Sequence, residues 1–457
     1  MNRLIVGVAV IALSACSTIE KEGSREITSL TSPDGFEFTF MPVYERGVTD
    51  ITVRIAWPTH WARTDGLNQA VPYAGTDLIL SGGTATRKPG EIMETFNDFN
   101  AYGNFSASPD YVIGELGFPR NHLDETVEIA SELLTNPQMD EQWLERIKQG
   151  FKTNQSDLYA ESGNLMWSAA RWAVLNDTPL LQALDVSDLD TIDAVTRDEI
   201  LAWHGSTFTR VVKAITVTGA ITKEDAGNVV DRLLEGLPEG EPMARSEDKA
   251  DFSPVTVLLH LPDAEKTTMG IVGQLPPTSD GGDYEDLLAL TLFGSSEGPL
   301  FQALRTELRA TYGIQAGYTN YTRELRPFYL FGEVVTAQLA EVSKVAIATY
   351  ENFRLNPDLT GLEELKLQVA DDARKDALYV DVAARLMMEA LLDGFDPVVL
   401  PAVHERFAAV TAQSIKTRLQ EAFPPGSAFM VMAVSPDPDA LPGACVITAP
   451  NQAMNCR

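Results

Sequence analysis

The feature that most constrains the fold is an order of elements that occurs twice along this 457-residue chain. Each half predicts one or two strands, two helices, a strand that contains a Gly-Glu pair, and a longer helix that stops at Asn-Pro. The Gly-Glu pair stands at 114–115 and again at 332–333, and the Asn-Pro pair at 136–137 and again at 356–357. This self-similarity indicates a duplicated domain. We therefore expect an α+β fold with two homologous, α/β-sandwich-like domains.

Hydrophobic periodicity places the elements of each half. In the first half it predicts strands over residues 50–57 and 111–116, a helix over about 70–80, and a helix from Leu123 to the stop at 136–137. Gly82-Gly83 is expected to end the first of these helices as its C-cap. In the second half the predicted elements are strands over 255–261, 269–275 and 328–333, and helices over 284–293, over 299–309, and from Leu339 to the stop at 356–357.

The boundary between the halves is expected at residues 238–253. Proline, glycine and charged residues dominate this stretch, and it shows neither helical nor strand periodicity. It would separate an N-terminal domain over residues 31–237 from a C-terminal domain over residues 254–457.

The N-terminus carries the pattern of an exported lipoprotein. A basic start and the apolar run from Leu4 to Ala12 precede Leu13-Ser14-Ala15-Cys16, which is similar to a bacterial lipobox. The run is too short to span a bilayer, so residues 1–15 are interpreted as a cleaved signal. Cys16 would then carry the lipid, and residues 16–30 would form a polar tether in the periplasm. Ser17 favours the outer membrane. The alternative is a cytosolic protein with an apolar start and an incidental cysteine.

The remaining two cysteines, Cys445 and Cys456, lie near the C-terminus. In an oxidising periplasm they could close a small disulfide loop. Two free thiols near the chain end are the alternative.

Charge narrows the set of partners. The chain has 35 basic and 65 acidic side chains, a formal net charge of −30. Nucleic acid and anionic membrane surfaces are therefore poor partners, and we expect no binding to nucleic acid.

The duplicated layout resembles the pitrilysin/insulinase peptidases, including the type found in mitochondrial processing peptidase. Ser32-Pro33-Asp34-Gly35-Phe36 is similar to the opening hairpin of that family, and Leu80-Ser81-Gly82-Gly83-Thr84 to the end of its first helix. The stretch from Gly298 to Arg305 is similar to its Leu-Phe-x-x-Leu-Arg helix. The resemblance implies that two domains form half of a peptidase clamshell, and that a chain of this length pairs with a second chain.

Active members carry His-x-x-Glu-His on the first helix, because residues four apart share a helical face and can meet one zinc ion. The motif would fall on residues 74–78, where Ala74 and Leu78 replace the histidines and Asp77 replaces the catalytic Glu. The third ligand would fall in residues 149–155, which contain no acid. No two of the five histidines stand at metal-binding spacing (His60, His122, His204, His260 and His404). We therefore expect no metal and no cofactor in this chain.

The resemblance also points to Arg305 and Tyr312, which stand seven residues apart. In the family such a pair reaches the active site and contacts the substrate backbone near the scissile bond. A guanidinium and a phenol can both donate hydrogen bonds to a carbonyl and its developing oxyanion. Arg309 stands where the family usually has Gly, so the turn before the strand could differ from that of the family. The alternative is an ordinary helix Arg and an ordinary strand Tyr.

The resulting hypothesis is a zinc-free subunit of a heterodimeric zinc metallopeptidase that cleaves peptides. The partner chain would carry His-x-x-Glu-His and the zinc, and Arg305 and Tyr312 would act in trans. The second hypothesis is a catalytically inactive peptidase-like scaffold or peptide-binding envelope lipoprotein. A third is an independent enzyme that uses another metal site.

Overall fold

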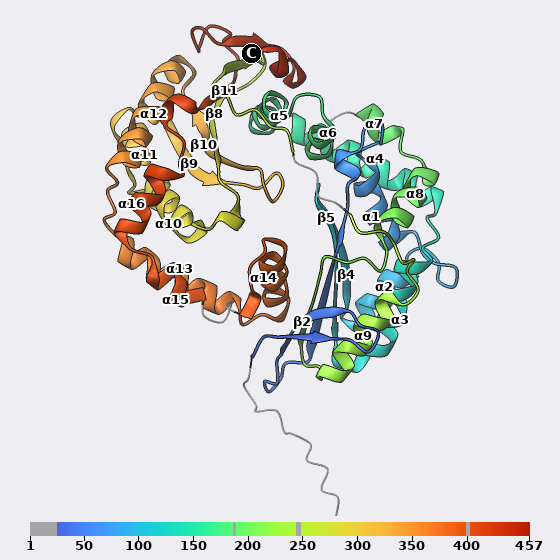
Figure 1. Cartoon of the computed structure of the whole chain (residues 1–457). Helices are drawn as coiled ribbons and strands as arrows, with labels where there is room; N and C mark the ends of the chain where they lie inside the picture. The colour runs from blue at the N-terminus through green and yellow to red at the C-terminus, as the bar shows by residue number, and fades with distance from the viewer. Residues whose placement is uncertain (1–24, 186–188, 244–247, 399–402) are drawn as a thin grey trace, which may run out of the picture.

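Two six-stranded sheets of mixed strand direction organise the chain in the computed structural model (Figure 1). The structure describes residues 25–185, 189–243, 248–398 and 403–457. The strand order is β1-β2-β6-β3-β5-β4 in the first sheet and β12-β7-β11-β8-β10-β9 in the second. Each sheet includes parallel pairs, β2 with β6 in one and β7 with both β11 and β12 in the other. The expected α+β class with two similar sheets is confirmed.

The strands follow the predicted hydrophobic runs. The first sheet contains β1 (Thr28–Thr31), β2 (Glu37–Pro42), β3 (Asp50–Pro58), β4 (Tyr102–Ala107), β5 (Tyr111–Pro119) and β6 (Ala214–Gly219). The second contains β7 (Thr256–His260), β8 (Thr267–Leu275), β9 (Thr311–Tyr318), β10 (Arg326–Val334), β11 (Met430–Ser435) and β12 (Cys445–Ile447). Every residue of β6 and β11 is buried, because helices cover both faces of each sheet at these central strands.

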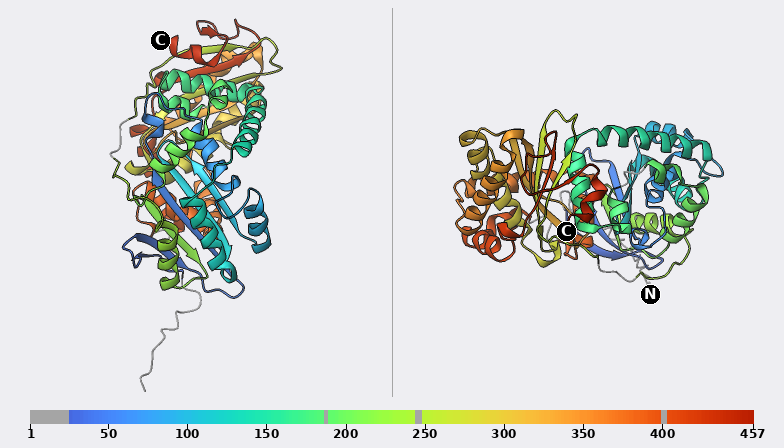
Figure 2. Two further views of the ribbon diagram at one scale, coloured as in Figure 1. Left: turned by 90° about the vertical axis from the view of Figure 1, so that its right-hand side faces the viewer. Right: turned by 90° about the horizontal axis from the view of Figure 1, so that it is seen from above.

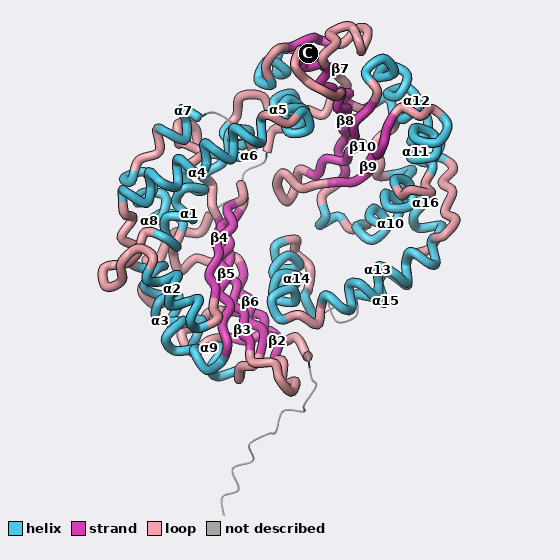
Figure 3. Tube along the Cα trace, turned by 180° about the vertical axis from the view of Figure 1, so that it is seen from behind, coloured by secondary structure: helices cyan, strands magenta, loops and turns pink. Residues whose placement is uncertain are grey.

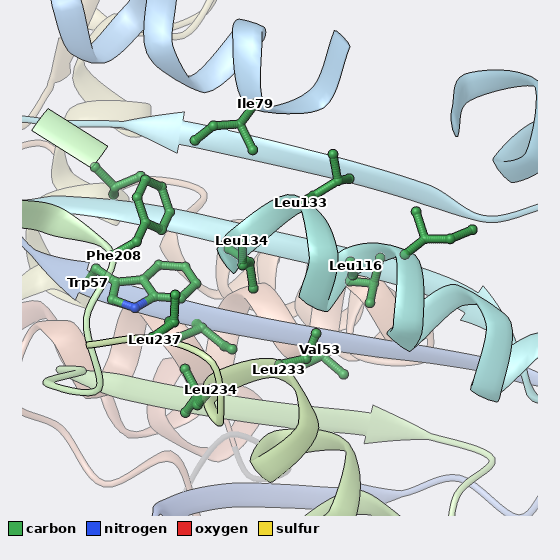
Figure 4. Close-up of a cluster of buried hydrophobic side chains, with 14 of the residues drawn as sticks. Val53, Trp57, Ile79, Leu116, Leu133, Leu134, Phe208, Leu233, Leu234 and Leu237 are labelled. Carbon is green, nitrogen blue, oxygen red and sulfur yellow. The ribbon is translucent and has the colours of Figure 1, made fainter. Parts of the chain in front are cut away.

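Nine helices are described in the first half: α1 (Val71–Ser81), α2 (Glu91–Phe99), α3 (Leu123–Thr135), α4 (Glu141–Tyr159), α5 (Ser162–Leu175), α6 (Pro179–Leu184), α7 (Leu189–Asp193), α8 (Arg197–Thr207) and α9 (Lys223–Leu234). Leucines of α3 and α9 point onto Val53 and Trp57 of β3, as Figure 4 shows, and these side chains belong to one buried cluster. The predicted C-cap is confirmed. The Gly82 N–H donates to Leu78 O at 2.7 Å, and Gly83 takes a positive φ of 79°.

The second half is described with seven α-helices: α10 (Asp283–Gly294), α11 (Pro299–Phe301), α12 (Leu339–Leu355), α13 (Leu362–Asp376), α14 (Val380–Leu392), α15 (Val403–Ala409) and α16 (Ala412–Glu421). Side chains of α10, α12 and α16 pack over one face of the second sheet around Phe328. The helix predicted over residues 299–309 is α-helical only in α11. It continues as a π-helical turn, η4 (Gln302–Glu307).

Short 3-10 helices complete the described elements: η1 (Trp61–Arg63), η2 (Arg120–His122), η3 (Thr278–Asp280), η5 (Thr336–Gln338), η7 (Gly426–Ala428) and η8 (Pro450–Asn455). The signal sequence and Cys16 lie outside the described residues. Because β1 begins at Thr28, the last residues of the predicted tether pair with β2 instead. No helix in the described ranges combines the length and apolar character needed to cross a bilayer.

Each half contributes one helix to the other half's sheet (Figures 1 and 3). Met166 of α5 packs against the second sheet, where Gly270 leaves room for its sulfur; a Cβ at Gly270 would lie 2.5 Å from that atom. Met388 of α14 packs against β3 and β5 of the first sheet. Each sheet is therefore covered on both faces. This packing connects the segments on either side of residues 238–253. The division into two domains at these residues stays a prediction.

A hydrogen bond joins the two halves where their hairpins approach each other, and ion pairs on either side hold the residues that make it. The backbone N–H of Arg323, in the β9–β10 turn, donates to Asp110 Oδ2 at 2.9 Å in the β4–β5 turn. Asp110 also pairs with Arg63 at 2.7 Å. The Arg323 guanidinium pairs with Glu389 of α14 and with Asp393, the C-cap residue of that helix. The exchange of helices and these contacts hold the β9–β10 turn against the first half.

Cys445 and Cys456 form a disulfide with a Cα–Cα distance of 5.7 Å. The bond ties β12 to the residue that follows η8, and η8 packs against α5 (Figure 2).

We expect a variant with both cysteines replaced by serine to lose roughly 2–3 kcal/mol of unfolding free energy, because the open loop gains entropy in the unfolded chain. Denaturant unfolding with and without reductant measures this loss. Reductant should destabilise the wild type but leave the double variant unchanged. Two free thiols by mass under non-reducing conditions would contradict the bond.

Candidate functional site

Arg305 and Tyr312 lie against each other at the edge of the second sheet. The Arg305 guanidinium carbon is 4.9 Å from the centroid of the Tyr312 ring, a cation–π contact. Arg305 is half-buried on η4, whereas Tyr312, on the edge strand β9, is 87% exposed. A tyrosine ring so exposed adds little to the core of this chain. The pair therefore presents two hydrogen-bond donors to whatever approaches this edge.

An unusual turn brings the two residues together. The N–H of Leu308 donates to Ala303 O at 3.0 Å, the wide spacing of a π-helix, and the N–H of Ala310 donates to Leu304 O at 3.0 Å. Arg309 then takes a positive φ of 55°, and the chain reverses into β9. Glycine adopts this conformation without strain, which accounts for the glycine usual in the resembling family. The turn is thus compatible with the family's residue, and Arg309 carries backbone strain.

This strain predicts that Arg309→Gly is stabilising. The expected gain is about 1 kcal/mol of unfolding free energy, because glycine relieves the left-handed conformation at some entropic cost. Arg309→Ala retains the Cβ and the strain, so it should leave the stability near that of the wild type. Chemical denaturation of the wild type, Arg309→Gly and Arg309→Ala measures these differences in unfolding free energy. An Arg309→Gly variant no more stable than Arg309→Ala would show that this turn is unstrained.

Two of the three residues at the zinc-motif position face the protein interior. Ala74 and Leu78 are 2% and 0% exposed on α1, and Asp77 lies on the exposed side of the helix. Helix α4, which contains the window expected for a third ligand, packs against α1 (Figure 1). The structure therefore brings together the two segments that the resemblance paired.

An apolar pocket of about 200 Å³ lies where these segments meet. Its lining combines Ala74 of α1 and Phe151 of α4 with the following side chains: Ala70, Tyr73, Ala183, Leu184, Ile192 and Val195. The Tyr73 hydroxyl donates to Ala183 O and is not available to a ligand. Hydrocarbon cannot replace the nitrogen and oxygen ligands that zinc requires, so these residues do not fit a catalytic zinc ion.

His204 and His122 have structural contacts. His204 Nε2 lies 2.9 Å from Leu134 O, its ring stacks on Phe208, and burial lowers its pKa. His122 stacks on Phe99. Within the described part of the chain, no three or more His, Cys, Asp or Glu side chains gather closely enough to hold a metal ion.

A second pocket, which the sequence did not indicate, lies between α5 and the β9–β10 hairpin. We call it the α5 pocket; its volume is about 460 Å³, and its lining is Trp167, Arg171, Leu184, Gln315, Thr319, Asn320, Tyr321, Tyr329 and Phe331. These residues come from three separate stretches of sequence. The only residue of this lining that stands out in the sequence is Trp167. It does not predict a pocket, because a tryptophan on an apolar helix ordinarily belongs to the core.

Comparison with known proteins identifies the fold. Residues 194–369 match the family model described as the peptidase M16 inactive domain. Over this range, which is less than half of the chain, the sequence is similar to a peptidase M16 inactive domain. The matched range runs from just before α8 into α13 and includes both Arg305 and Tyr312. The resemblance to the pitrilysin/insulinase family is thereby confirmed, and the inactive M16 domain fits a chain without a catalytic zinc.

Solved structures share this fold at low sequence identity. A peptidase M16 inactive domain from Pseudomonas fluorescens matches with a TM-score of 0.81 and 15% identity over 90% of this chain and 98% of that one. The first half of the periplasmic protease PqqL from Escherichia coli matches with a TM-score of 0.71 and 14% identity, over 94% of this chain and 96% of that one. Against the PqqL structure with both halves, the match again covers 94% of this chain but 50% of the other. No curated protein sequence matches significantly.

Proposed function

We propose that this M16 protein is the zinc-free subunit of a two-chain metallopeptidase. In this proposal a second chain carries His-x-x-Glu-His and the zinc ion, and this chain contributes Arg305 and Tyr312 to the same peptide. The observation that carries the proposal is the Arg305–Tyr312 contact, with the tyrosine 87% exposed at a sheet edge. Exposed donors at a sheet edge are available to a ligand or to another chain.

The comparison with PqqL supports a chamber of two halves. This protein has the fold of the first half of PqqL and covers 50% of the structure with both halves, which is a protease. An enclosed peptide chamber built in this way would require a second half besides the one described here. The apolar pocket around Ala74 supports the assignment of the zinc to the partner, because the residues that line it do not fit a zinc ion.

The chemistry assigned to the pair is hydrogen bonding to the substrate. The guanidinium is a planar fork of N–H donors, and its contact with the Tyr312 ring limits its orientations. A charged donor and a phenol held in this way can bind a peptide carbonyl and stabilise the oxyanion that forms during hydrolysis. Proton transfer and water activation would belong to the partner's glutamate and zinc.

We also place the protein in the periplasm, lipid-anchored through Cys16, with the outer membrane favoured. The lipobox-like Leu13-Ser14-Ala15-Cys16 supports the anchor. The Cys445–Cys456 disulfide supports an oxidising compartment, and the similar PqqL is a periplasmic protease. Mass spectrometry of the native N-terminus should find a diacyl or triacyl modification on Cys16.

The direct test is purification of the protein from its native host with its associated chains. We expect a His-x-x-Glu-His chain to co-purify, and the two purified chains to cleave peptides together but not separately. A zinc chelator should abolish the joint activity. Recovery of this protein as a stable homodimer without such a chain, or a partner chain fully active alone, would refute the proposal.

The second candidate is a peptidase-like scaffold that binds peptides without cleaving them. The apolar pocket at the zinc-motif position favours it, since this half has lost the means of catalysis on its own. A homodimer that binds peptides and leaves them intact is the result that distinguishes it from the first candidate.

A further inference from the structure

The α5 pocket opens on the face of the second sheet that is turned to the first half. Figure 1 shows α5 lying across this face, with the β9–β10 hairpin extending beyond it toward the first half. The floor of the pocket is formed by β9 and β10, where Tyr329 faces Gly317 and Phe331 faces Gln315 across the ladder. The Tyr329 ring lies over Gly317, where a Cβ would come within 2.8 Å of the tyrosine hydroxyl oxygen.

Aromatic rings form the apolar part of the pocket. The Trp167 ring lies edge-on to Tyr329 at a centroid distance of 5.1 Å and tilted against Phe331 at 5.8 Å. All three side chains are half-buried, so each also presents part of its ring to the pocket. Such a set offers both edges and faces to an incoming ring, the geometry that aromatic pairs prefer.

Polar groups surround the rings, and the single charged side chain of the lining is already paired. Arg171 Nη2 lies 3.3 Å from Asp185 Oδ1, so the pocket does not present an uncompensated charge to a ligand. The exposed side-chain amides of Gln315 and Asn320 stand at the rim and match the donors and acceptors of a peptide backbone. The buried Tyr321 hydroxyl lacks a hydrogen-bond partner among the described residues. The lining therefore favours a neutral ligand with both a ring and amide groups.

The pocket walls are held in place. Asn320 and Tyr321 belong to the turn that Arg323 anchors to Asp110, Glu389 and Asp393. Trp167 lies on α5, whose other side chains are part of a buried cluster with the second sheet. A pocket with fixed walls binds without first having to order them, which lowers the entropic cost of association.

We propose that the α5 pocket binds a bulky aromatic side chain of an extended peptide. The inference rests on the proposed function in one respect, since the peptide would be the substrate held between the two chains. The pocket would act in substrate selection and favour peptides with an aromatic residue over those with small or charged residues at the same position.

Binding to the full mature chain, without a partner, tests the pocket. The probes are two fluorescently labelled peptides that differ only in having phenylalanine or alanine at one central position. Fluorescence anisotropy measures the affinity of the chain for each peptide. We expect the phenylalanine peptide to bind roughly 10- to 100-fold more tightly, the value of burying one such side chain. Equal affinity for the two peptides, or no binding of either, would overturn the proposal.

Two variants localise the effect to the pocket. Gln315→Trp, at an exposed position on β9, should fill the pocket and remove the preference for phenylalanine while the protein stays folded. Trp143→Ala, a half-buried tryptophan on α4 outside the pocket, is the matched control and should retain the preference. A preference that survives in Gln315→Trp would place the binding elsewhere and refute the assignment.

The outcomes separate this proposal from the proposed function. If the phenylalanine peptide binds as expected but no pair of chains cleaves it, the pocket stands and the peptidase subunit role fails. If the pair cleaves both peptides with the same kcat/KM and the chain binds both equally, the subunit role stands and the pocket proposal fails.

Discussion

Replacing Arg305 by alanine is expected to slow peptide cleavage by the assembled pair of chains roughly 100-fold or more, the usual loss for an oxyanion donor. Tyr312→Phe should have an effect of similar size, because it removes the phenolic donor and leaves the ring beneath the guanidinium. Since Tyr312 is 87% exposed, its loss cannot act through the core. Steady-state kinetics of the reconstituted pair, with saturating partner chain, give the loss in kcat and kcat/KM separately.

The same turn supplies a control for this experiment. Glu307 is an exposed residue of η4, and Glu307→Ala should leave the rate unchanged. Circular dichroism and binding to the partner chain must be normal in all three variants. Full activity of the complex with both Arg305→Ala and Tyr312→Phe would mean that the pair is structural and that this chain contributes to the chamber in another way.

The largest expected effect on stability comes from Asp286, a carboxylate that is 0% exposed on α10. It accepts hydrogen bonds from Arg326 Nη1 at 2.7 Å and from Arg418 Nε at 2.8 Å. Arg326 is itself 1% exposed, with its guanidinium 3.9 Å from the centroid of the Tyr318 ring. Asp286→Ala should lower the unfolding free energy by roughly 3–5 kcal/mol, because it leaves a buried guanidinium with too little negative charge around it.

The measurement is denaturant unfolding at pH 8. Burial raises the pKa of the neighbouring Asp283 to about 6, although Arg326 opposes the shift, so at pH 8 that carboxylate is charged and still pairs with Arg326. Asp371→Ala removes an exposed carboxylate that pairs with Arg374 and Lys375, and should leave the unfolding free energy close to that of the wild type. If the two substitutions destabilise the protein equally, the buried network does not stabilise the second half.

Much of this fold could be predicted because its signals are local. The run over residues 50–57 alternates in one strand, and the helix that begins at Leu123 shows a single apolar face, so each element is readable without knowledge of its neighbours. The helix predicted over 299–309 was the exception. Its apolar spacing is helical, but a π-turn and the left-handed Arg309 interrupt it, and both depend on how the chain must enter β9.

The candidate site was predictable in part for the same reason. The spacing of Arg305 and Tyr312 and the absence of histidines near Ala74 can be read along the chain. The apolar pocket at the zinc-motif position could not, because Phe151 reaches Ala74 only through the packing of α4 on α1. The partners of Asp286 could not be predicted either, because Arg326 and Arg418 come from β10 and α16.

The sequence alone therefore determined the duplicated order of elements, the missing zinc motif and the two donors seven residues apart, since each depends on residue types at short spacing. The tertiary structure decided which surfaces meet. It exchanged α5 and α14 between the halves, placed the Arg305 guanidinium on the Tyr312 ring, and formed the α5 pocket from stretches far apart in the chain. The physical reason is that periodicity shows which face of an element is apolar, whereas the choice of covering partner depends on the surface buried by the whole chain.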